Sequence, residues 1–110
     1  MEHTKLSDLA DRLLAEAKQE HSGRAATTVH GGRHHSLRQT VVALTVGSEL
    51  SEHESPGEAT LQVLRGTVRL TAGSGDWTGG AGDLVVIPPE RHGLSAEEDS
   101  VVLLTVVKTV

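Results

Sequence analysis

The sequence predicts an all-β domain, an antiparallel β-barrel or sandwich, preceded by a single α-helix. Apolar residues recur at helical spacing only near the N-terminus, and short alternating or β-branched segments follow. Turns rich in glycine separate these segments, as is typical of barrels and sandwiches. A length of 110 residues suits one hydrophobic core. We therefore divide the chain into a helix and linker, residues 1–24, and a barrel domain, residues 25–110.

The composition excludes several classes of function. The chain has no cysteine, so it has neither disulfides nor a thiolate metal site nor a cysteine nucleophile. Its formal net charge of −5 and the lack of a basic stripe argue against a nucleic-acid partner. The N-terminal residues are polar and lead into an amphipathic segment, so we expect no signal peptide, no membrane span and a soluble cytoplasmic protein.

A helix is predicted from about residue 5 to residue 20. Its apolar positions are Leu6, Leu9, Ala10, Leu13, Leu14 and Ala17. We expect Thr4 or Ser7 to cap its first amides and Gly23 to end it. Its apolar face is expected to pack on the barrel or on a second subunit. An interfacial membrane helix is disfavoured because the charges on its polar face are mixed in sign.

Two β-branched segments follow, at residues 27–32 and 37–46. The run Val41–Leu44 is apolar on both faces, so we expect the barrel interior to cover one face and another layer or subunit to cover the other. The intervening cluster at residues 30–35 is rich in histidine. It is either a solvated turn, or His34 or His35 reaches the pocket as an additional ligand.

The segment from Gly47 to Gly66 carries the first motif of the chain. It consists of Gly47, five residues, His53, a Ser55-Pro56-Gly57 turn, an alternating strand and a closing Gly66. In the alternating strand Ala59, Leu61 and Val63 share one face. Gly66 permits a tight turn into a half-buried strand at residues 67–71, and a glycine-rich loop at 73–76 closes another hairpin.

A second motif begins at Gly82, with five residues before Pro88 and then His92. The two motifs resemble those of the cupins, and the resemblance covers roughly residues 37–107. It implies a small, RmlC-like, cupin-type antiparallel jelly-roll β-barrel, with Ala59, Leu61 and Val63 lining the interior. The chain has one tryptophan, Trp77, and neither phenylalanine nor tyrosine. We expect Trp77 to pack over the barrel surface and not to serve as a platform for a ligand.

The resemblance also implies a metal site, which this chain keeps only in part. Metal-binding cupins hold Fe, Mn, Ni, Zn or Cu with three histidines and a glutamate. Ser55 stands where the second histidine is expected and Ala59 where the carboxylate is expected, while His53 and His92 remain. A metal site here would consist of His53 and His92, completed by His34 or His35, by an inward-turned Glu58, or by water. The alternative is that His53 and His92 are hydrogen-bonded pocket residues that hold no metal. Glu58 is disfavoured, because a one-residue slip would turn its strand's apolar residues outward.

The second motif departs from the family as well. Glu90 stands where a glycine is usual, and the turn before His92 is one residue shorter than the common pattern. His92 nevertheless aligns best with the third histidine ligand of the family.

Two classes of function remain open at this point. The first is a binding module without a certain cofactor, whose pocket for a small molecule is formed by His53, Ser55, Ala59, Leu61, Val63 and His92. The second is an enzyme, either a metal-dependent oxygenase or isomerase with a reduced ligand set, or a metal-free catalyst whose histidines act as acid and base. We favour the binding module and assign no catalytic residue. Because the strands near Val41 and Val101 offer more apolar face than one barrel interior needs, we expect a homodimer.

Overall fold

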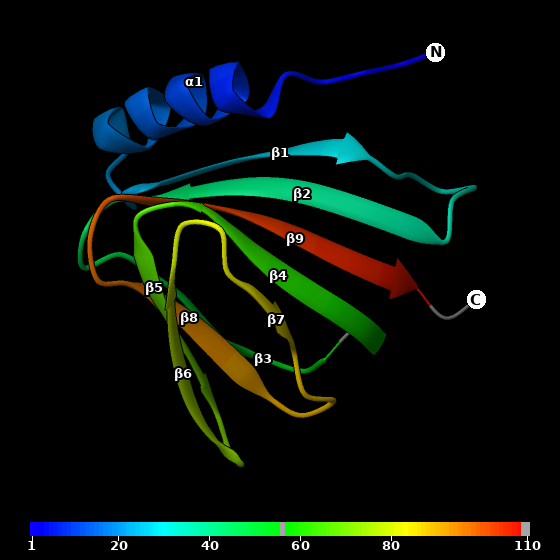
Figure 1. The fold of residues 1–110 in the computed structure, drawn as a ribbon, viewed down its shortest axis with the longest axis vertical. Helices are drawn as coiled ribbons and strands as arrows, with labels where there is room; N and C mark the ends of the chain where they lie inside the picture. The colour runs from blue at the N-terminus through cyan, green and yellow to red at the C-terminus, as the bar shows by residue number, and fades with distance from the viewer. Residues whose placement is uncertain (56, 109–110) are drawn as a thin grey trace.

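The computed structural model describes residues 1–55 and 57–108, so Pro56 of the predicted turn lies outside the described residues. The described chain forms one helix followed by nine strands (Figure 1). Their bounds are α1 Leu6–Gln19, β1 Arg24–His30, β2 Leu37–Leu44, β3 Glu49–His53, β4 Gly57–Arg65, β5 Thr67–Ala72, β6 Gly75–Gly80, β7 Leu84–Val86, β8 His92–Ala96 and β9 Ser100–Lys108.

The strands form two antiparallel sheets that face each other, which confirms the jelly-roll barrel. The large sheet has the order β1-β2-β9-β4-β7, and the small sheet has the order β3-β8-β5-β6. The last strand, β9, lies between β2 and β4, so the C-terminal strand occupies the centre of the large sheet. The turn between β4 and β5 crosses from one sheet to the other at Gly66, whose φ is +78°. A Cβ on Gly66 would lie 2.3 Å from the carbonyl oxygen of Asp99, so this crossing needs glycine.

The predicted helix is confirmed, but its predicted caps are wrong. Lys5 occupies the N-cap position and no side chain hydrogen-bonds to the first amides. The helix ends at Gln19, and Gly23, with φ +71°, turns the chain into β1 instead of capping the helix. Packing of the apolar face, which starts at Leu6, outweighs the local capping preference. No helix in the described part of the chain is long and apolar enough to cross a membrane.

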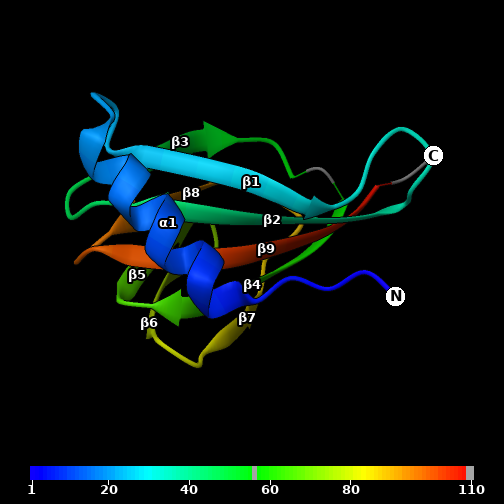
Figure 2. The ribbon, with the colours of Figure 1, turned by 90° about the horizontal axis from the view of Figure 1, so that it is seen from above.

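The strand β2 is covered on both faces, as its sequence predicts. Val42 and Leu44 belong to the cluster inside the barrel, whereas Val41 and Ala43 belong to a second cluster beneath α1. Seen from above, α1 lies across the outer face of the large sheet (Figure 2). The second layer is therefore the helix of the same chain, which covers the part of this face that suggested a dimer.

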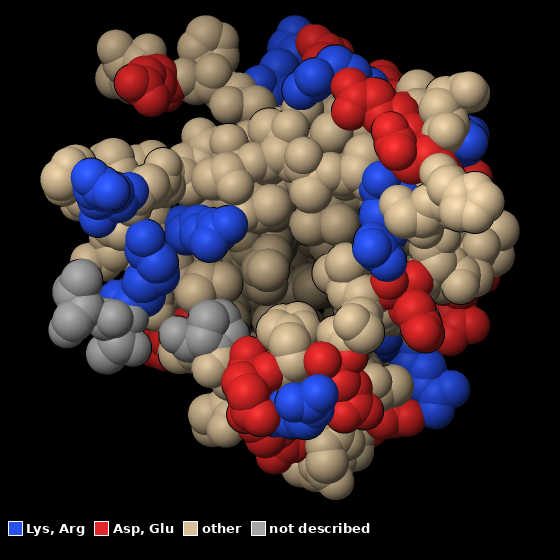
Figure 3. Space-filling model, turned by 180° about the vertical axis from the view of Figure 1, so that it is seen from behind, with Lys and Arg blue, Asp and Glu red and all other residues tan. Residues whose placement is uncertain are grey.

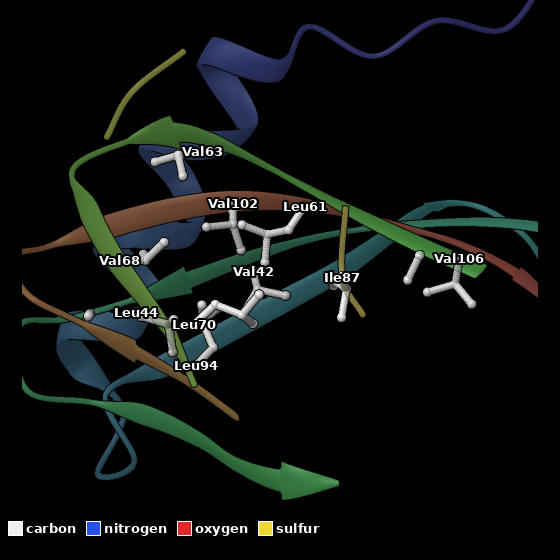
Figure 4. Close-up of a cluster of buried hydrophobic side chains, with 12 residues drawn as sticks. Val42, Leu44, Leu61, Val63, Val68, Leu70, Ile87, Leu94, Val102 and Val106 are labelled. Atoms are coloured by element: carbon white, nitrogen blue, oxygen red, sulfur yellow. The ribbon is translucent and has the colours of Figure 1, made fainter. Parts of the chain in front are cut away.

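Aliphatic side chains from both sheets point into the barrel and fill much of it (Figure 4). The buried members of this interior cluster are Val42, Leu44, Ala59, Leu61, Val63, Val68, Leu70, Ile87, Leu94, Ala96, Val102 and Val106. Trp77 packs against the same cluster from β6, so its ring completes the interior and does not cover the outer surface as expected. A Cβ on Gly79 would lie 2.1 Å from the Trp77 ring, so this glycine makes room for the indole.

Candidate functional site

A β-bulge in β3 brings His53 onto the barrel-facing side of the small sheet. Leu50 pairs with Leu94 and His53 pairs with His92, so β3 takes three steps where β8 takes two. Strict alternation would place a residue three positions after Leu50 on the opposite face. The extra residue in β3 reverses that parity, and both histidines therefore share the face of the interior leucines.

The two imidazole rings meet directly across the strand pair. Their centroids lie 4.5 Å apart and the ring planes are inclined by 63°. His92 is buried, with 5% of its surface exposed, whereas His53 is open to solvent. The pair thus extends from the interior of the barrel, where His92 lies, to the solvent-exposed edge, where His53 lies.

Hydrogen bonds to the backbone set which nitrogen of each neutral ring carries the proton. Nδ1 of His92 lies 2.9 Å from the carbonyl oxygen of Glu90, and Nδ1 of His53 lies 3.1 Å from that of Ser51. A carbonyl oxygen only accepts, so each Nδ1–H donates. Each Nε2 is then left with a lone pair, which can accept a proton, accept a hydrogen bond or bind a metal.

Glu90, whose carbonyl orients His92, is anchored through its own side chain. One carboxylate oxygen of Glu90 accepts hydrogen bonds from the backbone nitrogen of Ser74 at 2.7 Å and from its hydroxyl at 2.6 Å. These bonds lower the pKa of Glu90, the hydroxyl contributing most. In the sequence Glu90 is only a departure from a glycine; in the structure it ties the β5–β6 turn to the segment before His92.

The other predicted pocket residues lie deeper or are engaged elsewhere. The hydroxyl of Ser55 donates to the carbonyl oxygen of Gly57 at 3.0 Å, so its proton supports the local turn. Ala59 is buried beside its partner Val106 on β9. Leu61 and Val63 are 2% and 0% exposed, and they belong to the closed, filled part of the interior.

The structure does not bring His34 or His35 to the histidine pair. Both are exposed in the turn between β1 and β2, where the ring of His35 lies 4.8 Å from that of His30. Glu58 is exposed and pairs with Val107, on the outer face of the large sheet. Across residues 1–55 and 57–108, no three His, Cys, Asp or Glu side chains are placed to hold one metal ion. The donor set at His53 and His92 is thus smaller than the three protein ligands of typical catalytic metal centres.

The barrel is open along the side where β1 faces β3. Ala26 and Thr28 are exposed, although their partners Val42 and Thr40 lie on the barrel-facing side of β2. Viewed from behind, the molecule has a central hollow lined by residues other than Lys, Arg, Asp and Glu (Figure 3). Charged side chains of both signs surround this hollow.

Acidic residues flank the histidine pair on the small sheet. Arg91, next to His92 in the chain, pairs with Glu52 and Glu54 on either side of His53, each at 3.3 Å. These ion pairs are exposed, so they contribute little to stability but join the ends of β3 and β8. A separate surface cavity of about 690 Å³, lined by residues of the N-terminal segment and the outer face of the large sheet, contains neither His53 nor His92.

Comparison with known proteins identifies relatives of this fold. A family described as "Cupin domain" matches residues 40–108 of the chain. No curated protein matches the chain significantly. A solved protein of unknown function from Streptococcus pyogenes is 28% identical, with a TM-score of 0.75, over 100% of this chain and 92% of that one.

Two further solved structures are similar. An RmlC-like cupin protein from Desulfovibrio desulfuricans is 25% identical, with a TM-score of 0.67, over 76% of this chain and 81% of that one. A salicylate 1,2-dioxygenase from Pseudaminobacter salicylatoxidans is 20% identical, with a TM-score of 0.75, over 91% of this chain and 33% of that one. At 20% identity the likeness to the dioxygenase shows the fold alone.

Proposed function

The chain belongs to the cupin domain family, and from this premise we propose that it binds a small molecule at the open side of its barrel, beside His53 and His92. The observation that carries this proposal is the cross-strand histidine pair, with ring centroids 4.5 Å apart at the edge of an aliphatic interior. A few polar groups at the mouth of an apolar cavity are typical of small-molecule sites.

The chemistry of the pair suits recognition of a polar group on the ligand. With each Nδ1–H donated to a backbone carbonyl, each Nε2 is available to accept a hydrogen bond from a hydroxyl, an amine or an acid. The same lone pairs give the pair the chemistry of a general base toward a bound molecule. We therefore favour ligand binding as the function of the pocket over acid–base catalysis.

A metal-dependent cupin enzyme, an oxygenase or isomerase, is the second candidate. It is favoured by the fixed tautomers, because histidine ligands commonly donate their other nitrogen to a carbonyl or carboxylate. It is disfavoured by the donor set, since among the described residues only two histidines converge. We therefore place Fe, Mn, Ni, Zn or Cu binding behind metal-free binding.

Elemental analysis distinguishes the two candidates. It is carried out on the parent protein, purified without a histidine tag, and on the variants His53→Ala and His92→Ala. Metal-free binding predicts no stoichiometric metal and no thermal upshift when Mn, Fe, Ni, Zn or Cu is added. Stoichiometric metal that either substitution removes would establish the second candidate instead.

Binding itself is tested by an NMR screen of small amides, acids and sugars with a variant that obstructs the interior. Ala59→Leu adds bulk on the barrel-facing side of β4, and Thr60→Leu adds bulk at the next position, on the outer face. We expect Ala59→Leu to abolish the shifts that fragments cause and Thr60→Leu to preserve them. Fragments that bind Ala59→Leu as well as the parent protein would rule out this pocket.

The cytoplasmic location, the absence of a nucleic-acid partner and the homodimer stay predictions from the sequence. They do not affect the binding proposal, which concerns one chain.

A further inference from the structure

Basic residues that lack a carboxylate partner gather at one end of the barrel. Within the described part of the chain, five of the ten Lys and Arg side chains form ion pairs, and Lys5 and Arg24, which do not, lie elsewhere in the chain. Among the residues that the structure describes, Arg33, Arg38 and Lys108 pair with no carboxylate. Arg33 lies in the turn between β1 and β2, Arg38 near the start of β2, and Lys108 at the end of β9. These three cations are therefore free of a carboxylate among the described residues.

Arg38 lies on the barrel-facing side of the large sheet. It follows the alternation of Thr40, Val42 and Leu44, of which the last two belong to the interior cluster. Its partner on β9 is Val106, another member of that cluster. The side chain of Arg38 therefore leaves the sheet on its inner face, whereas Arg33 lies in a turn outside the sheet.

The stem of Arg38 is held against the backbone of the neighbouring turn. A Cβ on Gly31 would lie 3.1 Å from Cγ and 3.2 Å from Cα of Arg38, so the absence of a side chain at Gly31 allows the turn to approach Arg38 closely. Lys108 donates from Nζ to the carbonyl oxygen of Gly32 at 3.0 Å, so its ammonium is engaged with the same turn. Of these two cations at the end of the large sheet, Arg38 is the one whose donors no described residue uses.

Arg38 and the histidine pair belong to the same end of the barrel. His53 ends β3 shortly before Gly57, and Gly57 pairs with Lys108, two residues beyond the partner of Arg38. Figure 1 shows the start of β2, the end of β9 and the start of β4 together at this end. Arg38 and His53 thus start from the two sheets at the same end of the barrel, and the interior cluster lies between these sheets.

We propose that the pocket binds small organic acids. The apolar body of the acid lies inside the barrel and its carboxylate binds Arg38, while His53 and His92 line the opposite side of the pocket. The inference rests on the proposed binding function and adds the chemical class of the ligand. A guanidinium binds a carboxylate through two parallel hydrogen bonds, and the aliphatic interior accepts a body without charge. The net charge of −5 opposes phosphate esters, which carry more negative charge, more strongly than it opposes carboxylates.

The test compares acids with their uncharged amides by NMR titration. The probes are hexanoate with hexanamide, benzoate with benzamide, and phenyl phosphate. In the parent protein we expect each acid to bind about tenfold more tightly than its amide, a difference of about 1.4 kcal/mol. Arg38→Gln should remove that preference by weakening acid binding more than amide binding, while Arg38→Lys should retain part of it.

Arg33→Gln is the matched control, because it removes the same charge from the adjacent turn and not from the inner face. It should keep the acid preference, and unchanged melting temperatures should show that each variant folds. Equal binding of acid and amide, tighter binding of phenyl phosphate than of benzoate, or equal loss in Arg33→Gln would overturn the inference while leaving the binding pocket intact. If neither acids nor amides bind, the proposed function and this inference fail together.

Discussion

His53 and His92 face each other across two strands with ring centroids 4.5 Å apart, yet their environments differ sharply. His92 is buried and hydrogen-bonded to the carbonyl of Glu90, whereas His53 is exposed at the end of its strand. The two positions should therefore respond differently to the same substitution.

We expect His92→Ala to lower the free energy of unfolding by about 1–3 kcal/mol, because it leaves a cavity and removes the donor of the Glu90 carbonyl. His53→Ala should change it by less than about 0.5 kcal/mol, as is usual for an exposed side chain. Urea unfolding measures both values. Equal losses would show that the buried ring contributes no more than the exposed one.

Glu90 should make stability depend on pH at the acidic end. Hydrogen bonds from Ser74 lower the pKa of Glu90 in the folded chain. The stabilisation is therefore present above the carboxyl pKa of the unfolded chain and is lost as pH falls through the lower, folded pKa. In Glu90→Gln the drop in urea midpoint from neutral to acidic pH should shrink.

Glu58→Gln is the control for that pH series, since its carboxylate makes no hydrogen bond within the described part of the chain. It should reproduce the pH dependence of the parent protein. A Glu90→Gln variant with an unaltered pH dependence would mean that the bonds to Ser74 do not form in solution.

Gly79 should be intolerant of any side chain because the indole of Trp77 occupies that space. Gly79→Ala would place a Cβ 2.1 Å from the ring, so we expect a loss of about 1–3 kcal/mol and a shift in fluorescence of the only tryptophan. Gly73→Ala is the control, because its Cβ would meet only the Glu90 carboxylate at 3.9 Å. It should cost less than about 0.5 kcal/mol. A Gly79→Ala protein of parental stability would show that Trp77 packs elsewhere.

We propose that the homodimer forms through the part of the large sheet's outer face that α1 leaves uncovered. Leu84 and Val86 on β7 are 63% and 72% exposed there. Val86→Glu should place a charge in the contact and convert a particle of twice the chain mass into a monomer, measured by light scattering at micromolar concentration. Val46→Glu, at a 64% exposed position between β2 and β3, should leave the dimer unchanged. A monomeric parent protein would exclude the dimer.

Much of the fold follows from local patterns in the sequence. The helical spacing from Leu6 to Ala17 and the doubly apolar run Val41–Leu44 predict a helix and a strand covered on both faces, and both are present. The resemblance of the motifs around His53 and His92 to those of the cupins predicts the barrel and its interior residues Ala59, Leu61 and Val63, which the structure places in the interior cluster. The helix and the doubly covered strand depend on neighbours a few positions apart, so periodicity reveals them, whereas the jelly-roll barrel follows from the motif resemblance.

The site depends on relations between strands that periodicity does not contain. The bulge that turns His53 inward is a mismatch in step between β3 and β8, whose sequences give no sign of it. The pairing of Arg38 with an interior residue of β9 requires β9 to lie between β2 and β4, and the role of Glu90 depends on a turn sixteen residues away. Alternation states which residues share a face of one strand, but the pairing of distant strands decides which faces meet and which polar groups converge.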